Sequence, residues 1–233
     1  MILMSEDIAV NIGKIRERIA AAASRAGRDP NMIKLMAVTK TVSPERIKEA
    51  VAAGIYLFGE NYVQEAKEKI AALEKGVKWH MIGHLQTNKA KYAVHFFDCV
   101  QSVDRIGLAQ ELDKRARLAG HKIHALIEVN VSGEQSKSGI DAAAALELVK
   151  GVAALENISV RGLMTMPPYS DNPENARPYF RALKELAGEI SRAQIPGILM
   201  NELSMGMTDD FEVAIEEGAT IVRVGRAIFG ARR

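Results

Sequence analysis

A lysine at the end of a short apolar stretch near the start of the chain has the setting of a carbonyl-reactive amine. Residues 33–41 alternate with the period of a β-strand, which places Met36, Val38 and Lys40 on one face. Apolar neighbours disfavour the charged form of a lysine, and the neutral amine is the form that attacks a carbonyl to make a Schiff base. The same stretch also allows a lysine whose stem packs while its ammonium group reaches water.

Two glycine-containing loops near the end of the chain have the composition of a phosphate site. The first has the sequence SMGMT over residues 204–208, and the second contains Gly225 and Arg226 before a short turn. Hydroxyl groups, close backbone approach at glycine and free backbone N–H groups are the features that hold a phosphate. The alternative is that Ser204 and Thr208 only cap a helix and that Gly225 only makes a turn.

Arg223 lies inside an apolar run, residues 221–224, where a charged side chain needs a partner. That partner is either a carboxylate such as Glu202 or an atom of a bound ligand. The sequence leaves both interpretations open.

The histidines and the single cysteine give little support for a metal site. His80 and His84 are four residues apart, but a strand followed by a loop does not bring them to one helical face. Cys99 falls in a predicted strand, where we expect it to pack rather than react, and one cysteine forms no intrachain disulfide. We therefore expect no metal.

Apolar runs that alternate with helical patterns predict an α/β fold, a (β/α)8 TIM barrel with one extra N-terminal helix. The runs expected to form strands are residues 33–41, 55–58, 79–83, 97–103, 123–131, 160–166, 198–205 and 220–224. Eight such units fit a closed barrel better than an open sheet, and no G-x-G-x-x-G or Walker motif is present. Asp104 and either Thr208 or Asp209 are expected to cap the helices that follow them. The prediction is one domain, residues 1–233.

The loops after the strands of such a barrel form its functional face. The polar or reactive residues that follow the predicted strands are Lys40, Glu60, Asn61, His84, Asn130, Ser204, Thr208, Arg223, Gly225 and Arg226. A lysine that faces a phosphate site, with a further group to meet a ring nitrogen, is the layout of a pyridoxal phosphate site.

The composition is that of an ordinary soluble protein. The 233 residues are 48% hydrophobic and 26% charged, with a net charge of +2 that is too small to predict nucleic-acid binding. The start of the chain lacks the pattern of a signal peptide, and no apolar run approaches the length of a membrane span. We expect a cytoplasmic protein that binds neither nucleic acid nor membrane.

Six segments together resemble one family, the pyridoxal phosphate homeostasis proteins, which are single-domain relatives of the barrel domain of alanine racemase. The segments are AVTK at 37–40, FGENYVQE at 58–65, WHMIGHLQ at 79–86, GLMTM at 162–166, LSMGM at 203–207 and VRVG at 222–225. The resemblance implies an alanine racemase N-terminal-domain-like barrel that binds pyridoxal phosphate as a covalent aldimine to Lys40.

The resemblance also implies roles for the remaining site residues. Asn61, His84 and Met164 are expected beside the cofactor, and Ser204 and Thr208 are expected, with backbone amides near Gly225 and Arg226, to hold its phosphate. Arg223 is expected to meet the pyridine nitrogen. A permanently charged guanidinium disfavours protonation of that nitrogen, so the ring is a poorer electron sink for carbanion chemistry.

These roles favour a cofactor carrier over an enzyme. The expected function is vitamin B6 homeostasis, in which the chain holds the cofactor, passes it to apo-enzymes and affects the balance of amino and keto acids. The alternatives are a pyridoxal phosphate-dependent amino-acid racemase with weak activity and a barrel enzyme for a phosphorylated metabolite. The resembling racemases take their second base, a tyrosine, from a following domain that we expect to be absent here. Tyr56, Tyr62 and Tyr169 are left as possible neighbours of the site, and we expect a monomer.

Overall fold

Eight parallel β-strands close into a barrel in the computed structural model, which describes residues 7–73, 76–134 and 137–230. The barrel strands are β1 (Lys34–Val38), β2 (Leu57–Glu60), β3 (Lys78–Met81), β4 (Cys99–Val103), β5 (Ile123–Asn130), β7 (Ile158–Met164), β8 (Glu202–Met207) and β9 (Ile221–Val224). Neighbours pair in this order, and the ladder between β9 and β1 closes the ring, with Met36 beside Arg223. The predicted (β/α)8 architecture is thereby confirmed.

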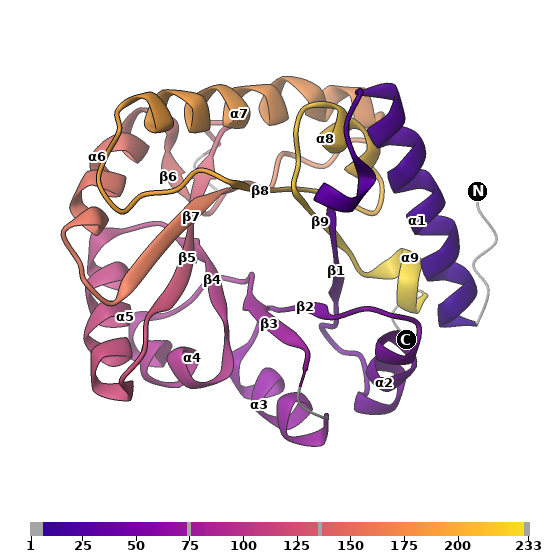
Figure 1. Ribbon diagram of the computed structural model, residues 1–233, viewed down its shortest axis with the longest axis horizontal. Helices are drawn as coiled ribbons and strands as arrows, with labels where there is room; N and C mark the ends of the chain where they lie inside the picture. Colours follow the sequence, from indigo (N-terminus) through magenta and orange to yellow (C-terminus); the bar gives the residue numbers. More distant parts are fainter. Residues whose placement is uncertain (1–6, 74–75, 135–136, 231–233) are drawn as a thin grey trace.

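Helices surround the barrel on its outside (Figure 1). They are α1 (Ile8–Arg25), α2 (Pro44–Ala52), α3 (Val63–Ala72), α4 (Ala90–Phe96), α5 (Ile106–Ala119), α6 (Ala142–Ala153), α7 (Arg177–Arg192), α8 (Phe211–Glu216) and α9 (Arg226–Phe229), with 3₁₀ turns η1 (Pro30–Met32), η2 (Thr87–Lys89) and η3 (Pro173–Ala176). Helix α1 precedes the first strand and packs against α8 and α9 from the other end of the chain. Because every barrel strand runs in the same direction, all carboxyl ends meet at one end of the barrel.

The main hydrophobic core lies between the barrel wall and the helices. It joins outward-facing strand residues such as Ala37 and Phe58 to the isoleucines of α1, of which Ile12 and Ile15 are buried. Burial of each such isoleucine stabilises the fold by about 1.5–3 kcal/mol. This packing accounts for the extra N-terminal helix, which was predicted and is present as α1.

The inside of the barrel is more polar than this outer core. Its apolar residues form two small clusters, Met36, Ile82 and Ile221 in one and Cys99, Leu126 and Met164 in the other. The interior also holds the buried polar side chains of Gln101, Ser204 and Arg223. Cys99 packs as expected, and burial raises the pKa of its thiol.

The seventh barrel strand differs from its predicted bounds. Residues 198–201 are not part of it, and β8 runs from Glu202 to Met207. The chain leaves a turn at Gly197, which has a φ of 77°, and only the Leu199 N–H reaches the neighbouring strand, at the Val160 carbonyl (3.1 Å). The apolar run at residues 198–205 therefore includes the segment that leads into β8 as well as the first residues of that strand.

Two predicted helix caps are also displaced. Helix α5 begins at Ile106 after Arg105, because the Asp104 carboxylate instead accepts a hydrogen bond from the Arg105 guanidinium (2.5 Å). Helix α8 begins after Asp210, one residue beyond the later of the two predicted caps. Asp209 is instead paired with Arg226.

A two-residue strand, β6 (Ile140–Asp141), was not predicted. It pairs in parallel with the end of β5, where Gly139 passes so close that an added Cβ would lie 2.7 Å from the Asn130 nitrogen. Two residues give no periodicity to detect. Within the described ranges, the helices are all too short or too polar to cross a membrane.

Candidate cofactor site

The predicted site residues gather at the carboxyl end of the barrel. Most stand in the last residues of a strand or in the segment that follows it, whereas Ser204 is the third of six residues in β8 and Arg226 begins α9. The residues are Lys40, Asn61, His84, Met164, Ser204, Thr208, Arg223, Gly225 and Arg226. Parallel pairing throughout the ring makes this clustering a direct consequence of the fold. Their roles in binding stay predictions, since position alone does not assign them.

Lys40 lies in the turn that follows β1. It comes two residues after Val38, which packs with Met36 in a cluster inside the barrel. Its side chain is half-buried, and its Nζ lies 5.2 Å from the centre of the Tyr62 ring. The amine is thus held at the mouth of the barrel against an aromatic face.

The two peptide groups that flank Lys40 are fixed by charged side chains. The Thr39 carbonyl accepts a hydrogen bond from Lys69 Nζ (2.5 Å), and the Thr41 N–H donates to Glu65 Oε1 (2.5 Å). Thr41 adopts a φ of 63°, a conformation that non-glycine residues seldom take. Lys40 therefore sits in a backbone turn whose shape is set by helix α3.

Glu60 completes this network on the outer side of the barrel wall. One of its oxygens accepts hydrogen bonds from Lys69 Nζ (2.6 Å) and the Thr39 hydroxyl (2.5 Å), and Lys69 Nζ also meets Glu65 (2.6 Å). Burial raises the pKa of Glu60, while the bonds from Lys69 and Thr39 act in the opposite direction.

Sequence reasoning missed this network. Its only local signal was the i, i+4 spacing of Glu65 and Lys69 on one helix, which usually marks an exposed pair. Here Lys69 is 4% exposed.

Arg223 is buried inside the barrel and is held by the protein through both terminal nitrogens of its guanidinium. Its Nη1 donates to the carbonyl and hydroxyl oxygens of Ser204 (2.7 and 2.8 Å), and its Nη2 donates to the Thr165 carbonyl (2.8 Å). Burial lowers the pKa of Arg223 to about 10, and the charges of Asp210 and Glu128 oppose that shift.

The carboxylate suggested as the partner of Arg223 was the wrong one. Glu202 stands at the opposite end of the barrel, where it pairs with Lys34. Arg223 is held by hydroxyl and carbonyl oxygens instead, which leaves its positive charge without a contacting carboxylate among the described residues.

Ser204 does not have the geometry of a phosphate ligand. Its side chain is fully buried, and its hydroxyl accepts from Arg223 while it donates to Gln101 Oε1 (2.6 Å). Gln101 Nε2 in turn donates to His80 Nδ1 (2.8 Å). Ser204 therefore positions Arg223, as one member of a hydrogen-bond chain that crosses the barrel interior.

The two loops predicted to bind phosphate lie side by side at the mouth. The Arg226 guanidinium is bound by both carboxylate oxygens of Asp209 (2.8 and 2.7 Å), which ties the loop after β9 to the loop after β8. Gly206, which is still part of β8, has a φ of 90°, and a Cβ there would lie 2.5 Å from the Ala214 side chain, so only glycine fits this position. Thr208 is half-buried beside it.

Asn61 and His84 complete the rim on the side of β2 and β3. A Cβ on Gly83 would lie 2.6 Å from the Asn61 carbonyl oxygen, so this glycine allows the two loops to pack together. His84 is exposed, and its Nδ1 lies 3.8 Å from a carboxylate oxygen of Asp104. Within the part of the chain that the structure describes, no group of three or more acidic, cysteine or histidine side chains has the arrangement of a metal site.

Comparison with known proteins shows which family this chain resembles. Residues 10–233 match the family model for the alanine racemase N-terminal domain. The chain is 48% identical to the pyridoxal phosphate homeostasis protein of Aquifex aeolicus (strain VF5), over 95% of this chain and 97% of the relative. It is 41% identical to the protein of the same name from Escherichia coli (strain K12), over 97% of each chain.

A solved structure shows the same arrangement of the chain. PipY of Synechococcus elongatus PCC7942, determined with PLP bound, is 37% identical and superposes with a TM-score of 0.83, over 93% of this chain and 100% of PipY. The close sequence relatives and the shared barrel lead to one conclusion. The chain belongs to the pyridoxal phosphate homeostasis proteins, within the alanine racemase N-terminal domain family.

Proposed function

We propose that this chain binds pyridoxal phosphate at the carboxyl end of the barrel, with Lys40 as the covalent attachment point. The observation that carries the proposal is the pairing of β1 with β9, which brings Lys40, two residues beyond the end of β1, near the buried guanidinium of Arg223 on β9. When bound, pyridoxal phosphate supplies an aldehyde carbon with which a lysine amine condenses with loss of one water.

The remaining residues fit the other parts of this cofactor. Arg223 provides a charged donor for a ring nitrogen, which it would keep unprotonated. The Thr208 hydroxyl and the backbone amides of Gly225 and Arg226 are assigned to the phosphate, because the Arg226 guanidinium is already occupied by Asp209. Asn61, His84 and Met164 stay assigned to the surroundings of the ring. Two of the relatives compared are named for pyridoxal phosphate, and PipY was solved with PLP bound.

The proposed role is a single-domain, monomeric carrier that holds the cofactor and passes it to apo-enzymes. Racemase chemistry needs a second proton-transfer group on the far side of a bound amino acid. Tyr56 lines a pocket at the opposite mouth, and the Tyr169 hydroxyl donates to Asp171 (2.9 Å). Tyr62 turns the face of its ring toward Lys40. These positions favour a carrier without robust turnover.

The test is to load the purified protein with pyridoxal phosphate, reduce it with borohydride and map the labelled peptide. We expect one pyridoxyl group on Lys40 and none in Lys40→Ala, with the visible absorbance band of the loaded protein lost in that variant. Lys48→Ala, which alters an exposed lysine of α2, is the matched control and should label normally. A label on another lysine, or rapid exchange of the α-proton of alanine by the loaded protein, would count against the proposal.

Arg223→Ala should keep the label on Lys40 but lower the affinity of the protein for pyridoxal phosphate. Loss of a charged hydrogen-bond donor is worth about 1.5–3 kcal/mol, or roughly a 10- to 150-fold weaker affinity. The visible absorbance should also change, because the ring nitrogen is freed from the guanidinium. Absorbance titration with pyridoxal phosphate measures both, with Arg192→Ala on the outer helix α7 as the control. Unchanged spectrum and affinity would remove Arg223 from the site.

A further inference from the structure

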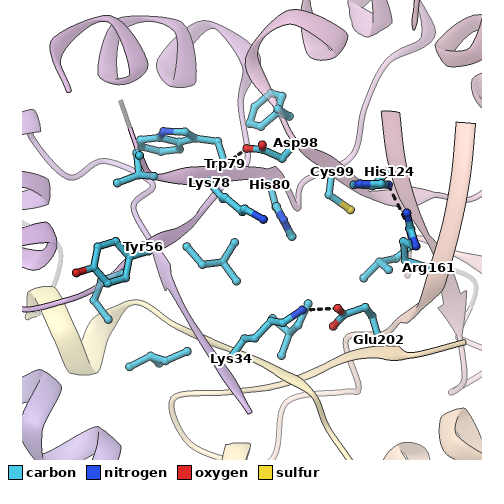
Figure 2. A pocket seen from close by; sticks show the side chains of 18 of the residues that line it. Lys34, Tyr56, Lys78, Trp79, His80, Asp98, Cys99, His124, Arg161 and Glu202 are labelled. Atoms are coloured by element: carbon cyan, nitrogen blue, oxygen red, sulfur yellow. Dashed lines mark hydrogen bonds and ion pairs between the residues drawn. The ribbon is translucent and has the colours of Figure 1, made fainter. Parts of the chain in front are cut away.

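A large pocket opens at the end of the barrel opposite Lys40. Its volume is about 1340 Å³, and it is lined by the first residues of the barrel strands rather than the last. Figure 2 shows Lys78 and His80 on one side of it, the paired Lys34 and Glu202 on the other, and Arg161 beside His124. This volume exceeds the roughly 300–1,000 Å³ typical of small-molecule sites, so a metabolite has room with its hydration water.

The pocket is lined by an excess of positive charge. Its Lys and Arg residues are Arg16, Lys34, Lys78, Lys122 and Arg161, whereas its carboxylates are Asp98 and Glu202. Both carboxylates are occupied, since Glu202 pairs with Lys34 and Asp98 accepts from the Trp79 N–H (2.8 Å). Among the described residues, Lys34 is the only one of these five cations with a carboxylate partner; Arg16 donates to the Gly54 carbonyl (2.7 Å) and Arg161 donates to His124 Nδ1 (3.2 Å). Lys78 and Arg161, which Figure 2 shows in the pocket with His80, therefore have donors left for a ligand.

The hydrogen-bond chain through the barrel adds a neutral donor to this pocket. Arg223 can only donate, so the Ser204 hydroxyl accepts from it and must give its own proton to the Gln101 oxygen. The Gln101 amide nitrogen then donates to His80 Nδ1, which must be an acceptor. The ring proton of His80 is consequently on Nε2, which has no partner among the described residues and belongs to a side chain that lines the pocket.

We propose that this pocket binds a small molecule carrying two negative charges on oxyanion groups, held by Lys78, Arg161 and the Nε2–H of His80. Arg offers a planar fork to an oxyanion, Lys offers a point charge, and the fixed tautomer of His80 offers a third donor between them. Because Lys78 and His80 stand on β3 and Arg161 stands on β7 of the same closed barrel, the backbone positions of the donors are fixed and need no loop to close. The site is independent of the proposed attachment of pyridoxal phosphate at the opposite mouth.

Isothermal titration of the full chain with succinate and, separately, with inorganic phosphate tests this site. The two probes distinguish a dicarboxylate from a phosphate source, and binding of either one at the pocket supports the proposal. In Lys78→Gln/Arg161→Gln we expect binding to weaken at least about tenfold, the loss of 1.4 kcal/mol or more. Lys78→Arg, which keeps the charge, should bind within a few-fold of the unaltered protein. Lys40→Ala should bind normally.

A second measurement needs no substitution in the pocket. In nitrogen-15-labelled protein, succinate should shift the ring signals of His80 and leave those of His84, at the other mouth, in place. Succinate binding that survives Lys78→Gln/Arg161→Gln, succinate binding lost in Lys40→Ala, a shift confined to His84, or no binding of either probe would each overturn the proposal. None of these outcomes depends on whether Lys40 is labelled by borohydride, so the two proposals fail separately.

Discussion

Replacing Lys69 with alanine is expected to lower the free energy of unfolding by about 3–5 kcal/mol, the usual cost of removing one partner from a buried ion pair. Lys69 Nζ bonds to Glu60, to Glu65 and to the Thr39 carbonyl at 2.5–2.6 Å, and its side chain is 5% exposed. Without it, the fully buried Glu60 loses its counter-charge and is forced toward its protonated form. Urea denaturation with far-ultraviolet circular dichroism measures the change.

The matched control is Lys67→Ala, which alters an exposed lysine two residues away on the same helix. It should change the free energy of unfolding by no more than about 0.5 kcal/mol. A second readout is the rate at which borohydride-trappable pyridoxal phosphate accumulates on Lys40, which should fall in Lys69→Ala because the Thr39 carbonyl loses its anchor. Equal free energies of unfolding for the two variants would show that the ion pairs of Lys69 with Glu60 and Glu65 make no net contribution to stability.

The second large effect concerns Glu128, a carboxyl in β5 that is 3% exposed and has one oxygen without a partner. Burial, with a smaller contribution from Asp104, raises the pKa of Glu128 to about 7, and Arg223 acts in the opposite direction. The ordinary value is 4.5, so between pH 4.5 and 7 the folded state holds a proton that the unfolded state has lost. Stability from this group is therefore complete below pH 4.5 and is lost as the pH rises through 7.

Glu128→Gln should remove this pH dependence. The amide resembles the protonated acid and does not titrate, so the cofactor-free variant should exceed the unaltered protein in free energy of unfolding by about 3 kcal/mol at pH 8 and by little at pH 4.5. Urea denaturation at both pH values measures the difference. Glu147→Gln, on an exposed side chain of α6, is the control and should follow the unaltered protein. A difference that is the same at both pH values would contradict the assignment.

The fold could be predicted from the sequence because its signals are local and repeated. Eight apolar runs alternating with helical patterns specify a closed parallel barrel, since few other arrangements bury so many strands on both faces. The bounds of individual strands were harder to predict than the architecture. Residues 198–201 are apolar enough for a strand, but the turn at Gly197 directs all but one backbone N–H away from the ladder.

From the sequence, the site could be predicted only to the extent that strand ends and family motifs identify individual residues. Lys40 and Arg223 stand where the alternation of β1 and β9 places them. The partners around them were not foreseen. Lys69, which binds the Thr39 carbonyl beside Lys40, comes from a helix, and Thr165, which binds Arg223, follows a strand two places along the barrel. Such pairings depend on tertiary contacts that leave no period in the sequence. Ser204 shows the same limit, since its residue type suits a phosphate while its burial commits it to Arg223.

The anchoring of both peptide groups beside Lys40 has a consequence for how the chain exchanges a cofactor. Ordering the backbone of one residue costs about 1–2 kcal/mol of conformational entropy. In the turn at Lys40 this entropy is lost when the chain folds, because Lys69 and Glu65 already fix the Thr39 carbonyl and the Thr41 N–H. For the proposed carrier role, loading and release are then expected to leave the mobility of the turn unchanged. Release would gain no conformational entropy there, and loading would lose none.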